Sequence, residues 1–199
     1  ESAGSVPLPV QISRTRVYFN LLPAPLYFTS AGQINAQVPW ELAGETSAQL
    51  VVVRNGAASL PVPVELGSTG PGIFLVRENA GVVVNGATGQ LVDAQTPARP
   101  GDTLVIYASG LGPVSANVTT GSPASSTELE PLRQSAEATL SIAGQSIALP
   151  VAFSGSAPGF IGVNQVNAVI PANAPAGAGS LRLRAGGAES NAVQISIQR

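Results

Sequence analysis

The sequence of 199 residues contains no cysteine, histidine, methionine or lysine. Without cysteine it cannot form disulfides or use a thiol nucleophile. Without histidine it lacks the base of a Ser-His-Asp triad and the commonest metal ligand. Without lysine, Schiff-base chemistry, a Ser-Lys dyad and a P-loop are also excluded. These absences favour a protein that is not an enzyme. Because no initiator methionine is present, we expect the sequence to be part of a longer chain.

Charge is also scarce, at 10% of residues and a formal net charge of −2, against a usual charged share of about 25%. Nucleic-acid binding needs clustered basic residues interleaved with aromatic ones. The only basic pairs are Arg14/Arg16 and Arg182/Arg184, and their spacing of two is typical of the solvated face of a strand. No run of about 18 apolar residues occurs. We therefore predict no nucleic-acid partner and no membrane span.

Short apolar runs are abundant, and many of the 22 glycines and 17 prolines separate them. Several runs alternate, as in 192–198, where valine and isoleucine lie opposite glutamine and serine. Alternation of this kind predicts strands with one face on a core. Asn55-Gly56, Asn85-Gly86 and Gly186-Gly187 are typical of two-residue hairpin turns. The one helical candidate, 126–134, is broken by Pro131. The sequence thus predicts an all-β sandwich or barrel.

An internal repeat refines this prediction. Residues 33–39 (QINAQVP) match residues 165–171 (QVNAVIP) at four of seven positions. Downstream, Gly56-Ala57-x-Ser59 matches Gly187-Ala188-x-Ser190. Positions expected to face the core repeat as well: Val62, Val64 and Leu66 match Val193, Ile195 and Ile197. We therefore predict two tandem immunoglobulin-like β-sandwich domains, 1–70 and 71–199, the second with a leading β-hairpin at 71–95.

The two copies are unequal. The second contains a strand and a glycine-rich bend, PGDTLVIYASGLGP at 100–113, that has no counterpart in the first copy. We therefore expect the first sandwich to lack its opening strand. An uncovered neighbouring strand would expose backbone N–H and C=O groups. The missing strand could precede Glu1 in a longer chain, or the segment 73–93 could cover the gap. We favour the first alternative, with the hairpin between the domains.

Six segments together resemble a known family. They are PAPLYFTSAGQINAQVPW (23–40), VRNGAAS (53–59), PGIF (71–74), PARPGDTLVIYASGLGPV (97–114), APGFIGVNQVNAVIP (157–171) and SNAVQISIQ (190–198). On these segments the chain is similar, from about Pro7 onward, to the acidobacterial (Solibacter-type) C-terminal domain family of large, mostly secreted proteins. Residues 101–112 also resemble the opening strand of IPT/TIG immunoglobulin-like domains. The resemblance implies an immunoglobulin-like sandwich in an extracellular or cell-surface setting, with no established reaction.

The most distinctive polar side chains are the repeated amides Gln33, Asn35, Gln165 and Asn167. Alternation places Gln and Asn on one face of each strand, opposite the apolar residues. They could form a polar ladder that binds a ligand. They could instead satisfy backbone groups of loops at the end of each sandwich, because buried backbone groups must be paired. On that second interpretation each asparagine is buried, and its replacement by alanine destabilises the protein by about 1–3 kcal/mol.

Trp40 is the only tryptophan, and the second copy has Ala172 at the matching position. It could stack on a sugar ring or anchor a partner. It could also cap the core or a domain interface. The leading functional hypothesis is a non-catalytic extracellular or cell-surface module for adhesion, spacing or binding of an unknown protein or glycan partner. The alternative is a carbohydrate-binding accessory module that uses Trp40 and nearby amides.

The carboxylates do not predict a catalytic or metal site. Calcium would need converging carboxylates and carbonyls, yet the sequence has only Asp93, Asp102 and a possible third ligand, Glu78, without a calcium-loop pattern. Asp102 is predicted to cap a turn. Glu128 and Glu130 lie in a Ser/Pro-rich segment expected to be an exposed loop, unlike the tuned carboxylate pair of a glycosidase. We expect no metal, no cofactor and no catalytic residue.

Overall fold

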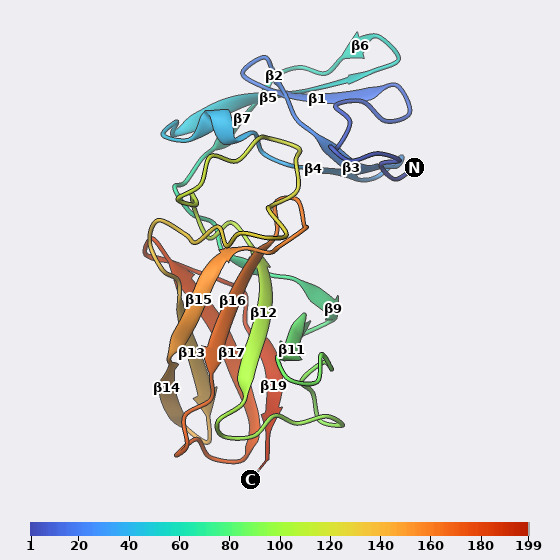
Figure 1. Ribbon diagram of the computed structural model, residues 1–199. Coiled ribbons are helices and arrows are strands. Elements are labelled where there is room, and N and C mark those ends of the chain that lie inside the picture. Colours follow the sequence, from blue (N-terminus) through green and yellow to red (C-terminus); the bar gives the residue numbers. More distant parts are fainter. Residues whose placement is uncertain (199) are drawn as a thin grey trace. The chain divides into compact units, whose positions relative to one another are not determined.

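The computed structural model describes residues 1–198, and all its named strands pair antiparallel. These residues contain no α-helix, and their one helical element is the 3-10 helix η1 (Trp40–Leu42). The all-β, sandwich-type fold class is thereby confirmed (Figure 1). The chain forms two compact units. Unit 1 comprises Glu1–Ser68, Asn117–Ser125 and Gly159–Gly162, and unit 2 comprises Thr69–Ala116, Ser126–Pro158 and Val163–Arg199.

Unit 1 contains one larger sheet and one strand pair. In the larger sheet the order is β2-β1-β5-β6, and β7 also pairs with β5. The second sheet consists of β3 and β4 alone. The strands are β1 (Thr15–Phe19), β2 (Leu22–Pro23), β3 (Leu26–Thr29), β4 (Ile34–Ala36), β5 (Ser47–Arg54), β6 (Ala57–Ala58) and β7 (Val62–Glu65).

The core of unit 1 lies between these two sheets. Along β1 alternate residues are buried, so that Val17 and Phe19 pack inward with Ala48 from β5 and Leu26 from β3. Burial of such side chains contributes about 1.5–3 kcal/mol each. Around them, further apolar residues are only partly buried: Ile34, Ala36, Leu50, Val52, Val64 and Leu66 among them. The core of unit 1 is therefore open on one side.

Unit 2 has two five-stranded sheets. One has the order β14-β13-β17-β18 with β19 also on β17, and the other has β11-β12-β16-β15 with β8 also on β12; β9 and β10 form a separate pair. The strands are β8 (Gly72–Ile73), β9 (Leu75–Arg77), β10 (Ala80–Gly81), β11 (Val83–Asn85), β12 (Thr103–Ser109), β13 (Glu137–Ile142), β14 (Gln145–Leu149), β15 (Val151–Ser156), β16 (Asn164–Val169), β17 (Gly177–Ala185), β18 (Ala188–Glu189) and β19 (Val193–Ile197).

The centre of unit 2 is built by strict alternation along β12 and β16, which pair side by side (Figure 1). Leu104 and Ile106 on β12, and Val166 and Ala168 on β16, are completely buried. Their neighbours in sequence lie on the opposite face and are partly exposed. Alternating apolar residues predicted this face correctly because the period of a strand is two.

The five-stranded sheet of unit 1 and the β14-β13-β17-β18 sheet of unit 2 share a strand order and a local hydrogen-bonding detail. Both have a strand pair, a long central strand, and two short partners for that central strand. In each, one serine hydroxyl accepts a backbone N–H from the long strand and donates to the next residue's carbonyl. In unit 1 Ser59 bonds Val52 (3.1 Å) and Leu60 (2.9 Å), and in unit 2 Ser190 bonds Leu183 (2.9 Å) and Asn191 (2.7 Å).

Each unit is made of several stretches that are separate in the chain. The chain first passes between units after Ser68, whereas the predicted boundary lies after residue 70. Residues 117–125 and 159–162, which lie inside the predicted second domain, belong to unit 1. Within 71–95, β9 pairs with β10, and Val84 bridges Leu91. These residues all lie in unit 2, so the segment 73–93 completes that unit.

Candidate functional site

The four amides selected from the sequence form two similar pairs. Just before β4, the Nε2 group of Gln33 donates to Oδ1 of Asn35 on that strand over 2.7 Å. On β16 the Nε2 group of Gln165 donates to Oδ1 of Asn167 over 2.9 Å. The first pair lies in unit 1 and the second in unit 2. Each unit thus presents an amide pair on the face of its strand opposite the apolar side chains.

The expectation that these amides are buried and satisfy loop backbone groups is wrong. Gln33 and Asn35 are exposed, Gln165 and Asn167 are half-buried, and each pair bonds within itself. The side chain of Asn35 is therefore not a buried polar group, and the large cost of leaving one unsatisfied does not apply to it. The interpretation failed because alternation fixes a shared face but does not say how well that face is covered.

Two neighbouring amides, missed from the sequence, do satisfy buried backbone groups. Gln37 is 8% exposed, and its Oε1 accepts the N–H of Gly121 over 2.8 Å. Asn164 is 6% exposed, and its Oδ1 accepts the N–H of Leu111 over 3.2 Å. The repeat contained a signal for the first of them, because Gln37 is polar where the second copy has apolar Val169.

Trp40 begins η1 at the end of the segment that carries β4. Its backbone N–H donates to Oγ1 of Thr120 over 2.9 Å, and the Thr120 hydroxyl donates to Oε2 of Glu41 over 2.7 Å. The residue is half-buried. Trp40 is therefore held in place through its backbone, while part of the residue remains accessible to a ligand.

Tyr27 on β3 bonds residues 159–162, the second of the two later chain segments that belong to unit 1. Its hydroxyl donates to the backbone carbonyl of Ile161. Burial raises the pKa of the Tyr27 phenol above its ordinary value, so that the side chain remains a proton donor at neutral pH. Tyr27, Gln37 and Trp40 therefore all contact residues 117–125 or 159–162, and Gln37 and Tyr27 are structural in this respect.

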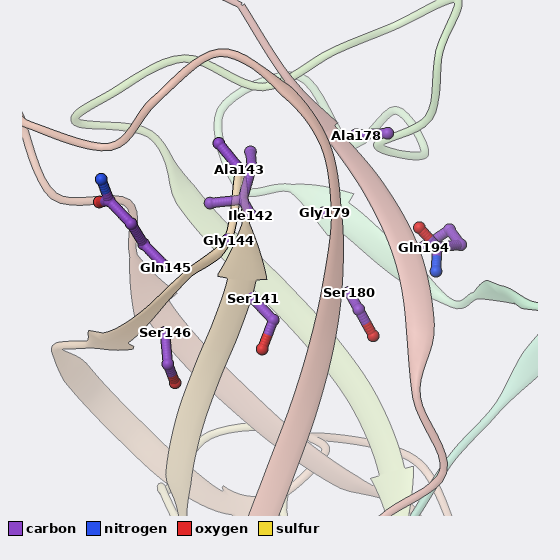
Figure 2. Close-up of a pocket in the computed structure, with 10 residues that line it drawn as sticks. All are labelled: Ser141, Ile142, Ala143, Gly144, Gln145, Ser146, Ala178, Gly179, Ser180 and Gln194. Atoms are coloured by element: carbon purple, nitrogen blue, oxygen red, sulfur yellow. The ribbon is translucent and has the colours of Figure 1, made fainter.

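A shallow polar hollow of about 430 Å³ lies on the outer face of one sheet of unit 2 (Figure 2). Cross-strand pairing aligns four side chains along it: Ser146, Ser141, Ser180 and Gln194, from β14, β13, β17 and β19. Their hydroxyl and amide groups can donate and accept hydrogen bonds but carry no charge. The hollow offers hydrogen bonds without a nucleophile–base pair, and it was not selected from the sequence.

The two aspartates considered as metal ligands have structural partners. Oδ2 of Asp102 accepts from Nδ2 of Asn85 (2.7 Å) and from the N–H of Arg99 (2.8 Å), which confirms that it caps a turn. Oδ1 of Asp93 accepts the N–H groups of Thr96 and Gln95, which hold the pKa of this carboxyl below its ordinary value. Within residues 1–198 no three His, Cys, Asp or Glu side chains converge on a metal site.

All four arginines are exposed, and Arg182 and Arg184 share the solvated face of β17 as predicted. The prediction is wrong for the first pair, because Arg14 lies in the turn before β1 with a φ of 57°. Arg16 donates through Nε to Oε1 of Gln11 over 2.6 Å at the edge of a second shallow hollow. Arg182 donates to the carbonyl of Ser190 over 2.9 Å, and Arg184 lies 3.9 Å from Glu137. Exposed pairs of this kind contribute about 1 kcal/mol or less.

No family model and no curated protein matches this chain. The resemblance to a Solibacter-type domain family therefore stays a prediction. In the part of the chain that the structure describes, none of the helices is long and apolar enough to cross a membrane.

A further candidate surface emerges when matched positions of the two copies are compared. Val62 of β7 is 52% exposed, whereas its match in unit 2, Val193, is fully buried. Val38, just after β4, is 48% exposed, whereas its match Ile170 is fully buried. Two positions that are buried in unit 2 are thus accessible in unit 1, and we call Val38 and Val62 the open apolar positions.

Proposed function

We propose that this protein is a non-catalytic extracellular or cell-surface module that binds a partner protein through unit 1. The observation that supports the proposal is the exposure of the open apolar positions Val38 and Val62, whose matches Ile170 and Val193 are fully buried. Full burial of one such side chain is worth about 1.5–3 kcal/mol. A partner that covered these positions would gain part of that free energy, whereas the isolated unit does not.

We also propose that the two units arose as a tandem repeat of one immunoglobulin-like sandwich. The shared strand order and the matching hydrogen bonds of Ser59 and Ser190 support this. The resemblance to domains of secreted proteins supports an extracellular location. A surface with few charges suits such a setting, because it limits nonspecific electrostatic binding.

Photo-crosslinking tests the partner-binding function. A photoreactive amino acid is placed at Val62, or at Leu21 as a matched control that is 90% exposed in the same unit. Each protein is incubated with secreted and surface proteins of the source organism. We expect discrete crosslinked species from position 62 and none from position 21. Equal labelling from both positions, or hydrolysis of ester or glycoside substrates that is lost in Glu128→Gln, would contradict the proposal.

A carbohydrate-binding function is the second candidate. It is favoured by the exposed Gln33–Asn35 amide pair and by the partial exposure of Trp40 in the same unit. Aromatic rings bind the apolar face of a sugar, and amides bind its hydroxyls. On a glycan array we expect binding that Trp40→Ala abolishes and Leu21→Ala retains, with both variants melting as the parent does. An array without any bound glycan would remove this candidate.

A further inference from the structure

The outer edge of β4 presents backbone groups that no other strand of residues 1–198 pairs with. β4 pairs only with β3. On the β3 side, the N–H of Gln37 donates to Pro25, and the carbonyl of Gln33 accepts from Ser30. Because successive residues of a strand direct their backbone groups to opposite edges, the N–H and C=O groups of Ile34, Ala36 and Val38 point away from β3.

The matching edge of β16 in unit 2 is occupied by β12. The N–H of Ile170 donates to Asp102 over 2.9 Å, and the carbonyl of Ile170 accepts from Gly101 over 2.8 Å. The pairing continues along the two strands, with Ala168 opposite Leu104 and Val166 opposite Ile106. Since Val166, Ala168 and Ile170 match Ile34, Ala36 and Val38 in the repeat, β12 shows which element fits this edge.

Burial follows the presence or absence of that strand. Val166, Ala168 and Ile170 are fully buried. Their matches Ile34 and Ala36 are only partly buried, although they pack on the core of unit 1, and Val38 is about half exposed. A sheet edge with unpaired backbone groups beside apolar side chains is where an extended peptide can bind as an additional strand.

We propose that the outer edge of β4 binds an extended segment of another protein as an added antiparallel strand. The segment would have the chemistry of β12, with aliphatic side chains such as Leu104 and Ile106 at alternate positions facing the core and uncharged side chains such as Val105 and Tyr107 on the other face. Its backbone would bond Ile34, Ala36 and Val38, and its aliphatic side chains would cover Val38. This inference rests on the proposed partner-binding function and specifies the partner.

A peptide of residues 100–111 (PGDTLVIYASGL) serves as the probe for the 199-residue chain. The control peptide has the changes Leu104→Asp and Ile106→Asp. With saturating probe we expect the amide hydrogens of Ile34, Ala36 and Val38 to exchange at least about tenfold more slowly. The Gln37 amide, already bonded to Pro25, should not change. The control peptide should have no effect.

Matched variants locate the site. Val38→Lys places a charge at the apolar edge, and we expect it to weaken probe binding at least about tenfold. Asn35→Lys places the same charge on the exposed face of β4 and should leave the affinity unchanged. Both variants should retain the melting temperature of the parent within about 2 °C, the shift expected of an exposed substitution.

Several outcomes would overturn the inference. These are no binding of the probe, protection confined to unit 2, or equal loss of affinity in both lysine variants. Concentration-dependent dimerisation that protects the same three amides without probe would identify a second copy as the occupant instead. If the probe fails while crosslinks at Val62 persist, the partner-binding function stands and only the strand-addition mode is rejected.

Discussion

At the scale of single residues, the polar side chains that bond segments distant in the chain are amides and hydroxyls rather than ion pairs. Gln37 is the clearest case, because it joins β4's segment to residues 117–125 through the N–H of Gly121. Replacing Gln37 by leucine leaves that buried N–H without its acceptor. We expect the free energy of unfolding to fall by about 1–3 kcal/mol, measured by urea denaturation.

Asn35→Ala is the matched control for that variant, because Asn35 is an exposed amide of the same segment. Its effect should stay within about 0.5 kcal/mol. A loss for Asn35→Ala as large as that for Gln37→Leu would contradict the distinction between the two amides.

Asp93 gives a prediction for acid pH. Backbone N–H groups of Thr96 and Gln95 lower its pKa in the folded state below the ordinary 3.8. A carboxyl with a depressed folded pKa contributes stability above its unfolded pKa, and this contribution is lost as pH falls through the folded pKa. We therefore expect Asp93→Asn to flatten the decline in melting temperature below about pH 4. A titration of Asp93 by NMR with a midpoint above 3.8 would contradict this assignment.

At the scale of elements, turn chemistry was predicted well where backbone conformation alone decided it. Asn55-Gly56 and Gly186-Gly187 both adopt positive φ and join β5 to β6 and β17 to β18. The two-residue turn expected at Asn85-Gly86 is wrong, because the bridge is Val84 to Leu91. There Oδ1 of Asn85 accepts hydrogen bonds from the N–H groups of Ala87 and Thr88, and a loop longer than two residues begins at Asn85.

The contact between β10 and β19 depends on the absence of one side chain. A Cβ atom added at Gly81 would lie 2.8–2.9 Å from the side chain of Val193. We expect Gly81→Ala to destabilise unit 2 by about 1–3 kcal/mol through overpacking, observed as a lower urea midpoint. Gly70→Ala, where nothing lies within 4 Å of the added atom, is the control. Recovery of stability in the double variant Gly81→Ala with Val193→Ala would identify the steric cause.

At the scale of the whole molecule, the all-β class followed from alternation and turns, whereas membership of the units did not. Alternation reports which side chains share a face, so it identified the inner face of β12 and β16. It carries no information on long-range partners such as Gln37 and Gly121. For the same reason the sequence identified the amide pairs but not their exposure, and it missed the hollow beside Ser141 and Ser180.

The difference in core coverage predicts unequal local stability. Apolar residues that are buried along β16 and β19 have partly exposed matches along β4 and β7. Amide exchange reports local opening, which costs less where fewer apolar contacts must be broken. We expect amides of β1 and β5 to exchange faster than those of β13 and β17. Slower exchange in unit 1 than in unit 2 would show that its open side does not weaken it.

The assignment of residues 117–125 and 159–162 to unit 1 has a consequence for how this architecture can be inherited. A gene fragment that stops at codon 68 would encode a sandwich without the Gly121 and Ile161 backbone groups that Gln37 and Tyr27 bond. Recombination at that codon would therefore damage both products. The two units would therefore have to be inherited together as one segment of a gene, even though each unit contains its own sheets.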